Sequence, residues 1–301
     1  MNRRTFVRQS VAAAAGVSLA GQAAAQPATT PPQPFKLRYA PHFGMFENHA
    51  GKNLLDQLKF MADEGFTALE DNGMPGRPVA EQEKIAAEMQ RLRMDMGVFV
   101  VNGDIAWMPS MTTGDLAIRD KWLAACRHAV EVAKRVNAKW MTVVPGFYQR
   151  SLPIGIQTAH VIDWLRRGCE IFEPHGLVMV LEPLSDTPDL FLRYSDQTFM
   201  ICKAVNSPSC KLLFDMYHMQ KNEGHIIYNI DQTWDEIPYF QIGDNPGRKE
   251  PTSGEMNYKN IFKHIHSRGY TGILGMEHGN AAPGKEGERA LINAYREVDG
   301  F

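Results

Sequence analysis

The sequence predicts a single closed (β/α)8 barrel over residues 36–301, and three observations lead to this fold class. Short apolar segments of strand character alternate with longer segments that carry apolar residues at helical spacing. Such alternation is typical of parallel βαβ units, and eight units fit the usual length of a closed barrel, about 250 residues. The alternative is an open doubly wound sheet. No glycine-rich loop follows the first expected strand, which weakens the nucleotide-binding version of that alternative.

The N-terminus differs in kind from the rest of the chain. "MNRRTFVRQS" pairs Arg3 with Arg4, and the apolar stretch "VAAAAGVSLAGQAAA" follows. This order is typical of a twin-arginine export signal. Ala23 and Ala25 fit a small-x-small cleavage pattern, so we expect a disordered signal peptide over residues 1–25. Export by the general route and an uncleaved anchor are the alternatives.

Residues 26–35 begin with "QPATTPPQP", a Pro-rich tether that cannot build a core. We expect the precursor to use the twin-arginine export machinery and the mature protein to be periplasmic. The formal net charge is −2. The chain offers no basic patch for nucleic acid and no apolar run that could span a bilayer. We therefore expect a small-molecule substrate and, after signal cleavage, neither nucleic acid nor a membrane as partner. A homo-oligomer is left open.

Eight segments are expected to be strands, because apolar runs end at turn residues in each. In chain order they cover 36–44, 66–73, 98–103, 139–146, 177–184, 210–220, 237–245 and 272–279. The fifth, "LVMVLEPL", is typical of a strand buried on both faces, as parallel sheets have. It nevertheless ends in a carboxylate, Glu182, which is costly to bury without a hydrogen bond, an ion pair or a metal.

Each strand is followed by a segment with helical periodicity. These helices are expected at 53–65, 79–97, 120–138, 160–176, 196–206, 221–236, 258–269 and 287–298. Gly97 is interpreted as the residue that closes the second helix. No domain boundary is visible after residue 35.

The last four strands each carry one oxygen donor near the carboxyl end: Glu182, Asp215, Gln241 and Glu277. In a barrel these ends meet at one face, where the active site lies. Three carboxylates in one pocket repel one another, and a divalent cation is the natural compensation. Oxygen donors without cysteine or several imidazoles suit Mg²⁺ or Mn²⁺ better than zinc. We therefore predict one such cation, held by these four residues. For any one of them alone, a structural hydrogen bond is the alternative.

The stretches "LEPL", "LLFDMYHMQ", "FQIGDNPGRKEPTSGEMNY" and "GMEHG" resemble the hydroxypyruvate isomerases, within the xylose-isomerase-like TIM-barrel superfamily of sugar isomerases and epimerases. The segment of the seventh strand is the most specific, because it has glutamine where most of the superfamily has a histidine ligand. The resemblance covers about residues 36–299 and is strong from 178 onward.

The resemblance implies the same four metal ligands, and it implies that Glu182 and Glu277 also act as the catalytic acid/base pair. It further implies that His218 contacts the substrate and that Arg248 lies beside it. The alternatives are a hydrogen-bonded structural histidine and an arginine that braces its loop. Three further residues could line the pocket or serve packing and capping: His42, Glu70 and Trp107.

The implied reaction is the metal-dependent isomerisation of hydroxypyruvate to tartronate semialdehyde through an enediolate. The cation would stabilise the developing negative charge, and the two glutamates would move the proton. Arg248 would hold the substrate carboxylate as a bidentate fork. A ketose C-3 epimerase or a sugar dehydratase on the same barrel is the alternative. A non-catalytic periplasmic binding protein is a further one, against which the intact set of four ligands weighs.

Overall fold

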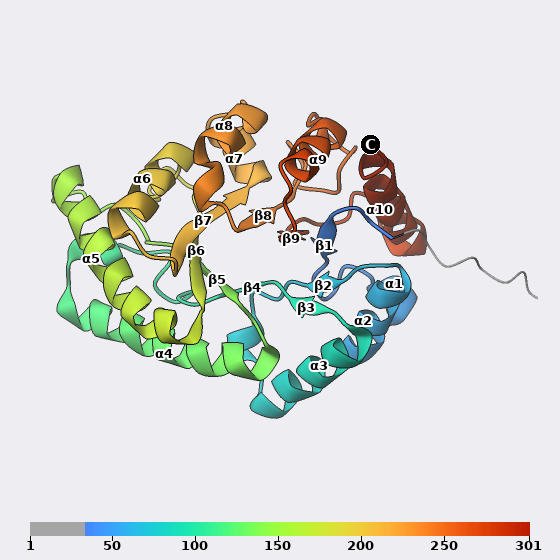
Figure 1. Ribbon diagram of the computed structural model, residues 1–301, viewed down its shortest axis with the longest axis horizontal. Helices are drawn as coiled ribbons and strands as arrows, with labels where there is room; N and C mark the ends of the chain where they lie inside the picture. The colour runs from blue at the N-terminus through green and yellow to red at the C-terminus, as the bar shows by residue number, and fades with distance from the viewer. Residues whose placement is uncertain (1–33) are drawn as a thin grey trace, which may run out of the picture. The chain divides into compact units, whose positions relative to one another are not determined.

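In the computed structural model, which describes residues 34–301, short parallel strands are surrounded by helices (Figure 1). The strands are β1 (Arg38–Ala40), β2 (Ala68–Leu69), β3 (Asp95–Met96), β4 (Val98–Val100), β5 (Trp140–Val143), β6 (Val178–Leu181), β7 (Cys210–Asp215), β8 (Tyr239–Gln241) and β9 (Ile273–Gly275). The predicted signal peptide lies outside the described residues, as does the tether up to residue 33. Within the described part of the chain, no helix has both the length and the apolar character needed to cross a bilayer.

The strands form a ring of eight positions. One sheet runs in the order β1-β9-β8-β7-β6-β5-β4, and β2 pairs with β3. Only Gly97 separates β3 from β4 in the chain, so these two strands occupy one position. A parallel bridge joins His42 to Glu70, and the Glu70 amide donates to the Pro41 carbonyl over 2.9 Å, which links β1 to β2. The predicted barrel is confirmed.

The helices lie outside the ring and, apart from α1 and α7, at or near the predicted positions. They are α1 (Glu47–Ala50), α2 (Leu54–Asp63), α3 (Val79–Leu92), α4 (Leu116–Val136), α5 (Ile154–Phe172), α6 (Ser195–Val205), α7 (Met216–Asn222), α8 (Ile226–Thr233), α9 (Tyr258–Ser267) and α10 (Gly284–Val298). Side chains cap several of them. Asn53 accepts from two backbone amides at the start of α2, and Asp115 does the same for α4, as helix N-termini require.

The prediction that Gly97 closes the second helix is wrong. Helix α3 ends at Leu92, and Arg93 adopts the left-handed conformation, with φ = 57°, that terminates it. Gly97 lies between β3 and β4 instead. A Cβ atom there would collide with the hydroxyl of Tyr239, which projects from β8 into the barrel. The glycine is therefore needed for packing inside the ring.

The sixth unit also differs from the prediction. The strand expected over 210–220 ends at Asp215, because this side chain caps α7 by accepting from the Tyr217 amide over 2.7 Å. His218 consequently lies on a helix rather than on the strand. The single helix expected over 221–236 is divided at Gly224, whose φ is 63°, into α7 and α8.

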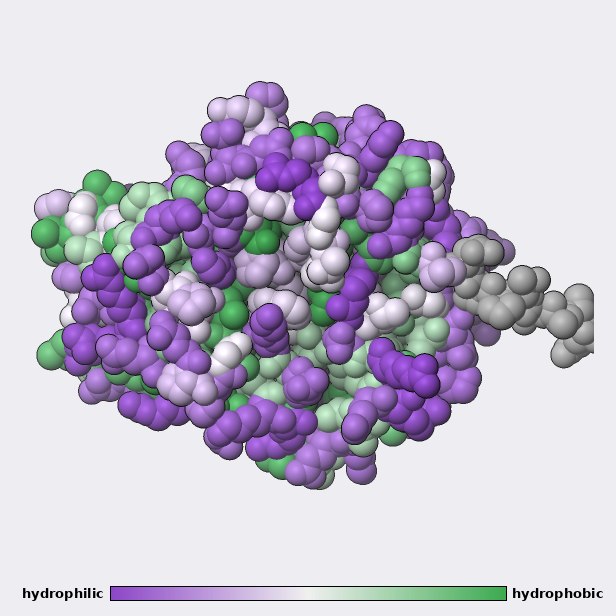
Figure 2. Space-filling model, in the orientation of Figure 1, coloured by the Kyte–Doolittle hydropathy of each residue, from purple (hydrophilic) through white to green (hydrophobic). Residues whose placement is uncertain are grey.

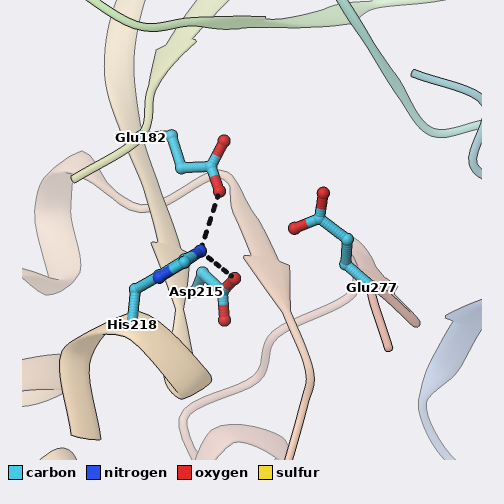
Figure 3. A group of neighbouring side chains, drawn as sticks. All are labelled: Glu182, Asp215, His218 and Glu277. Atoms are coloured by element: carbon cyan, nitrogen blue, oxygen red, sulfur yellow. Dashed lines mark ion pairs between the residues drawn. The ribbon is translucent and has the colours of Figure 1, made fainter. Parts of the chain in front are cut away.

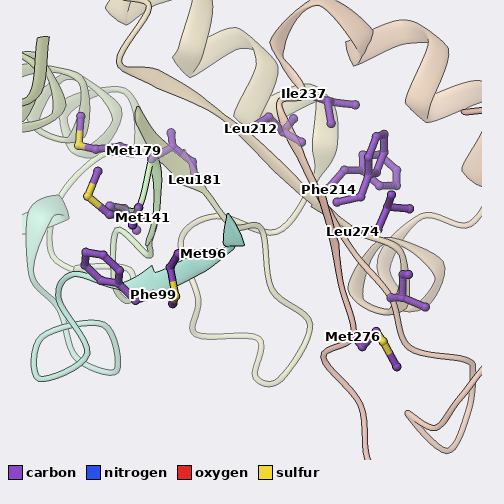
Figure 4. Packing of buried hydrophobic residues seen from close by; sticks show 14 of the residues in the cluster. Met96, Phe99, Met141, Met179, Leu181, Leu212, Phe214, Ile237, Leu274 and Met276 are labelled. Carbon is purple, nitrogen blue, oxygen red and sulfur yellow. The ribbon is translucent and has the colours of Figure 1, made fainter. Parts of the chain in front are cut away.

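Two apolar clusters lie on opposite faces of the strands. The small cluster inside the ring comprises Ala40, Ala68, Val98, Val178, Val180, Leu213, Tyr239 and Ile273. The large cluster packs the other face of the strands against the helices and includes Met141, Met179, Leu212 and Phe214 (Figure 4). Because side chains alternate along a strand, the next inward positions after Val180, Leu213 and Tyr239 are Glu182, Asp215 and Gln241.

Hydrophilic side chains cover most of the face seen in Figure 2, and apolar ones gather at its left, around α5. Ile154 and Ile156 of this helix are about half exposed. The described cysteines, Cys126, Cys169, Cys202 and Cys210, are all buried and unpaired. They therefore serve as small apolar core residues, separate from the polar strand ends.

Candidate metal and substrate site

Four side chains converge at the carboxyl ends of the strands (Figure 3). Glu182 follows β6, Asp215 ends β7, His218 lies on α7 and Glu277 follows β9. Each offers one ligand atom, and these atoms lie within 4.8 Å of one another. Glu182, Asp215 and His218 are almost completely buried. The structure thus brings together three of the predicted metal ligands, and the cluster is a candidate site for a divalent metal.

Glu182 is a buried carboxylate without a hydrogen bond from any described residue. The nearest polar partner of Glu182 is Nε2 of His218, 3.9 Å from its Oε1 atom and beyond hydrogen-bond distance (dashed in Figure 3). Burial, together with the charges of Glu277 and Asp215, raises the pKa of Glu182 well above the usual range. Because a buried, unpaired carboxylate is unstable as an ion, this group requires a proton or a cation beside it.

Glu277 and Asp215 share one arginine. Nη2 of Arg248 donates to Oε2 of Glu277 over 2.7 Å and to Oδ2 of Asp215 over 3.2 Å. The other oxygen of Glu277 accepts from Nδ2 of Asn72 over 2.9 Å. Burial raises the pKa of Glu277 to about 7, although Arg248 opposes the rise. This value lies in the range that suits a catalytic base.

The Arg248 side chain is held in place from several directions. Its backbone is in the left-handed region with φ = 50°. Nε donates to the Glu277 carbonyl over 3.1 Å, and the guanidinium lies 4.9 Å from the centre of the Tyr217 ring. Among the described residues none accepts from Nη1. Since Arg248 also lines the cavity described below, one edge of its guanidinium is available to a bound molecule.

The contacts of His218 determine which ring nitrogen carries the proton. Nδ1 lies 3.1 Å from the amide nitrogen of Ser185. A backbone N–H can only donate, so Nδ1 accepts and the neutral ring is protonated at Nε2. Burial lowers the pKa of His218, which favours this neutral form. In this tautomer its Nε2–H, 3.4 Å from Oδ2 of Asp215, is a hydrogen-bond donor, so His218 would have to lose that proton before Nε2 could bind a metal.

Gln241, the fourth predicted ligand, is oriented by a hydrogen-bond network. Nε2 of Gln241 donates to Oε1 of Glu70 over 2.8 Å, and the Tyr239 hydroxyl donates to Oε2 over 2.8 Å. A Cβ atom at Gly275 would overlap the Glu70 carboxylate, so glycine is required at that position. The sequence left the role of Glu70 open, and the structure shows a buried, hydrogen-bonded acid that fixes the amide of Gln241.

This network leaves Oε1 of Gln241 buried and without a partner in the described chain. The amide oxygen of Gln241 and the carboxylates of Glu182, Asp215 and Glu277 are hard oxygen donors of the kind Mg²⁺ and Mn²⁺ prefer. The residues present therefore fit a divalent cation of this class.

A cavity of about 230 Å³ opens onto the cluster. The residues that line it are Asn72, Val100, Gly103, Ala106, Trp107, Thr142, Val144, Glu182, Leu184, Asp186, His218, Arg248 and Glu277. Trp107, half exposed, is thus a pocket wall, as the sequence allowed. His42 instead contacts the carbonyls of Phe43 and His278 and does not line the cavity.

A larger groove of about 690 Å³ lies between α3 and α4 and reaches the start of β3. It is therefore at the amino ends of the strands, the opposite end from the one where barrel enzymes place their active sites. The smaller cavity at the strand ends is the candidate substrate site.

The sequence did not identify Asn72 or Thr142 as pocket residues. Thr142 carried a usable signal, because it is the only polar residue in the apolar run "WMTVV" and lies two positions after the inward-facing Trp140. The signal for Asn72 was weaker: it lies two positions after Glu70. In both cases the strand period of two predicts an inward side chain.

Comparisons with known proteins identify the family to which the chain belongs. A family model described as "Xylose isomerase-like TIM barrel" matches residues 58–298. The chain is 31% identical to hydroxypyruvate isomerase of Escherichia coli (strain K12) over 163 residues, which cover 53% of this chain and 61% of that enzyme. It is 28% identical to 2-oxo-tetronate isomerase of Cupriavidus necator over 255 residues, which cover 80% of this chain and 92% of that enzyme. The first match thus spans less than two thirds of the relative's length.

Two solved structures illustrate the shared fold. The 3-keto-D-glucoside 4-epimerase of E. coli superposes with a TM-score of 0.72 at 18% identity, covering 87% of this chain and 99% of that one. The IOLI protein, crystallised with a zinc atom, superposes with a TM-score of 0.68 at 15% identity, covering 87% and 96%. At such identities the likeness shows the fold alone.

Proposed function

Because the chain belongs to the xylose isomerase-like TIM barrel family, we propose that it is a metal-dependent isomerase of a short hydroxy-keto acid. The simplest such reaction converts hydroxypyruvate to tartronate semialdehyde. The observation that carries the proposal is the buried carboxylate of Glu182, which accepts no hydrogen bond from residues 34–301 and whose ligand atom lies within 4.8 Å of that of Glu277. The names of the isomerase relatives support the same reaction class.

The two glutamates move the proton. One carboxylate removes a proton from the carbon beside the substrate carbonyl, which forms an enediolate, and it or its partner returns a proton to the former carbonyl carbon. The proton of the substrate hydroxyl passes to the former carbonyl oxygen, so atoms and charge balance. Glu277, with its pKa near 7 in the metal-free protein, can both accept and release a proton at neutral pH.

Glu182, Asp215, Gln241 and Glu277 would hold a divalent cation, which would supply Lewis-acid stabilisation of the charge that develops on the substrate oxygens. We propose Mg²⁺ or Mn²⁺, because the donors are oxygens. His218 donates its Nε2–H to a substrate oxygen. Arg248 offers the free edge of its guanidinium to the substrate carboxylate.

A C-3 epimerase or a dehydratase would use the same proton removal on a ketose. The epimerase and isomerase outcomes differ in whether the carbonyl moves, which product analysis distinguishes. We also propose, from the sequence of residues 1–25, that the precursor is exported by the twin-arginine machinery and that the mature enzyme works in the periplasm.

The experiment is metal analysis combined with turnover. The mature protein is assayed on hydroxypyruvate and on uncharged ketoses before and after EDTA treatment, and again after addition of Mg²⁺ or Mn²⁺. We expect one bound metal per chain, loss of keto-acid isomerisation on chelation, and recovery with the metal. Full activity in a verified metal-free preparation would end the proposal, as would turnover confined to uncharged ketoses.

A further inference from the structure

One nitrogen of Arg248 contacts two of the proposed metal ligands at once. Nη2 donates to Oε2 of Glu277 over 2.7 Å and to Oδ2 of Asp215 over 3.2 Å. The Asp215 side chain is 1% exposed and that of Arg248 is 29% exposed, so the ion pair is largely shielded from solvent, where charges interact strongly. Arg248 therefore neutralises the same carboxylates to which a divalent cation would bind.

The oxygen of Asp215 that faces the cluster is the one that Arg248 holds. Oδ1 accepts from the backbone amide of Tyr217 over 2.7 Å as the N-cap of α7, and this amide cannot turn away while the helix is intact. Oδ2 lies 3.4 Å from Nε2 of His218, on the cluster side. A cation that enters the cluster therefore reaches Asp215 through Oδ2, beside Nη2 of Arg248.

Arg248 is the group that can give way. A guanidinium and a divalent cation on one carboxylate oxygen repel each other. Nε of Arg248 donates to the Glu277 carbonyl over 3.1 Å, and the guanidinium lies 4.9 Å from the centre of the Tyr217 ring, which holds the inner part of the side chain. The outer part lines the cavity, and within residues 34–301 Nη1 has no acceptor to lose.

The conformation of Arg248 in the structure cannot hold a substrate carboxylate as a fork. A bidentate contact needs two nitrogens along one edge of the guanidinium. Nε and Nη2 both donate to protein oxygens, so only Nη1 is left for a bound molecule. Once Nη2 leaves the two carboxylates, Nη1 and Nη2 together present one edge to the substrate carboxylate.

We propose that Arg248 is an internal counter-ion that the divalent cation displaces, and that the displaced guanidinium completes the site for the substrate carboxylate. Tight binding of the carboxylate then depends on prior binding of the metal. An uncharged substrate does not need this step. The inference rests on the metal site of the proposed function and adds to it an order of binding.

Titration of the mature protein with Mn²⁺, in the absence of substrate, measures the competition. Arg248→Met keeps the length of the side chain and removes its charge without adding an oxygen ligand. At pH 8, above the pKa of Glu277 of about 7, we expect Arg248→Met to bind Mn²⁺ about 10- to 100-fold more tightly than the wild type. An affinity equal to that of the wild type, or lower, would overturn the inference.

Lys221→Met is the matched control for a change of charge alone. Lys221 is exposed and lies 5.1 Å from the centre of the Tyr217 ring, the ring that Arg248 also contacts. Its Nζ donates to the Tyr217 hydroxyl over 3.5 Å. We expect the Mn²⁺ affinity of Lys221→Met to stay within about twofold of the wild type, because solvent screens an exposed charge. A gain equal to that of Arg248→Met would show that net charge sets the affinity, and would overturn the inference.

Thermal unfolding and a crystal structure give two measurements that do not depend on affinity. Without metal, Arg248→Met should melt below the wild type, because the carboxylates lose their counter-ion, and Mn²⁺ should raise its Tm by more than that of the wild type. In wild-type crystals grown with Mn²⁺, Nη2 should lie beyond hydrogen-bond distance of Oδ2 of Asp215. Retention of both hydrogen bonds by Nη2 beside a bound Mn²⁺ would overturn the inference, even if Arg248→Met does not fold.

The same affinities separate this inference from the proposed function. If Arg248→Met binds Mn²⁺ and the wild type does not, the counter-ion role stands and the proposed metal-dependent reaction is wrong for the natural chain. If both bind Mn²⁺ equally, the proposed function stands and the counter-ion role is wrong. If neither binds it, both are wrong.

Discussion

Removal of the carboxyl group of Glu70 should weaken metal binding although Glu70 is not among the predicted ligands. Glu70 accepts from Nε2 of Gln241 and from the hydroxyl of Tyr239, each over 2.8 Å. These two contacts aim Oε1 of Gln241 away from Glu70. In Glu70→Leu the amide of Gln241 loses its anchor and can present its NH₂ group where the cation requires an oxygen.

The size of the effect follows from the lost contacts. Two buried donors without acceptors cost about 1–3 kcal/mol each. For a domain of this size each kcal/mol lowers Tm by roughly 2–4 °C, so the loss of about 2–6 kcal/mol should lower Tm by roughly 4–24 °C. Removing a group that orients a metal ligand typically lowers affinity by about 10–100-fold, and this is the expected loss for Mn²⁺.

Glu70→Gln is the matched conservative variant. Burial, together with the charge of Glu277, raises the pKa of Glu70 well above its usual range, so the neutral carboxyl is favoured in the metal-free protein. A glutamine keeps the oxygen that accepts from Gln241, and it places an NH₂ beside Tyr239, whose hydroxyl donates to Glu70 in the wild type and must turn to accept instead. We expect its Mn²⁺ affinity to stay within about threefold of the wild type.

Glu288 provides a control for stability alone. This fully buried carboxylate accepts from the backbone and side chain of Asn48 and from His49, and it does not line the cavity. Glu288→Leu should therefore lower Tm and leave the Mn²⁺ affinity of the folded protein unchanged. Differential scanning calorimetry and Mn²⁺ titration are run on all four proteins. The reasoning is refuted if Glu70→Leu binds Mn²⁺ as the wild type does, or if Glu288→Leu loses as much affinity.

Four further predictions concern the proposed chemistry and export. Glu182→Gln and Glu277→Gln should each lower kcat by at least about 100-fold with an unchanged circular dichroism spectrum; near-normal kcat would remove that residue from the mechanism. Because the pKa of Glu277 is raised to about 7 in the metal-free protein, a proton occupies it below pH 7 and must leave when metal binds. Mn²⁺ affinity measured by calorimetry should therefore fall by up to about tenfold per pH unit below 7, whereas a flat profile from pH 5 to 8 would contradict this. Arg248→Lys keeps the charge but loses the planar fork, so kcat/KM should fall roughly 10–100-fold on a keto acid and much less on an uncharged ketose; equal losses would mean that Arg248 only braces its loop. Replacing Arg3 and Arg4 by Lys should trap the precursor in the cytoplasm, and unchanged delivery in a fractionation assay would point to the general export route.

The sequence alone determined the barrel and the common location of the three acidic candidate ligands. Strand and helix periods depend on residues within a few positions of one another. The strand "VMVLEPL" and the strands after it can therefore be recognised from local sequence alone. Parallel strands present their carboxyl ends at one edge of the sheet. For that reason Glu182, Asp215 and Glu277 could be assigned to one site although long segments separate them in the chain.

Only the tertiary structure decided which groups meet across the barrel. Glu70 contacts Tyr239 and Gln241 across 169 and 171 residues of chain, and no local pattern encodes a pairing of that range. Gly97 resembles a helix terminator from its neighbours, but its role comes from the Tyr239 hydroxyl that packs against it. Whether the hydroxyl oxygen of Thr142 finds a hydrogen-bond partner likewise depends on the groups that surround it in the fold. Hydrogen-bond satisfaction depends on every group within about 3 Å, and only the folded chain specifies which groups those are.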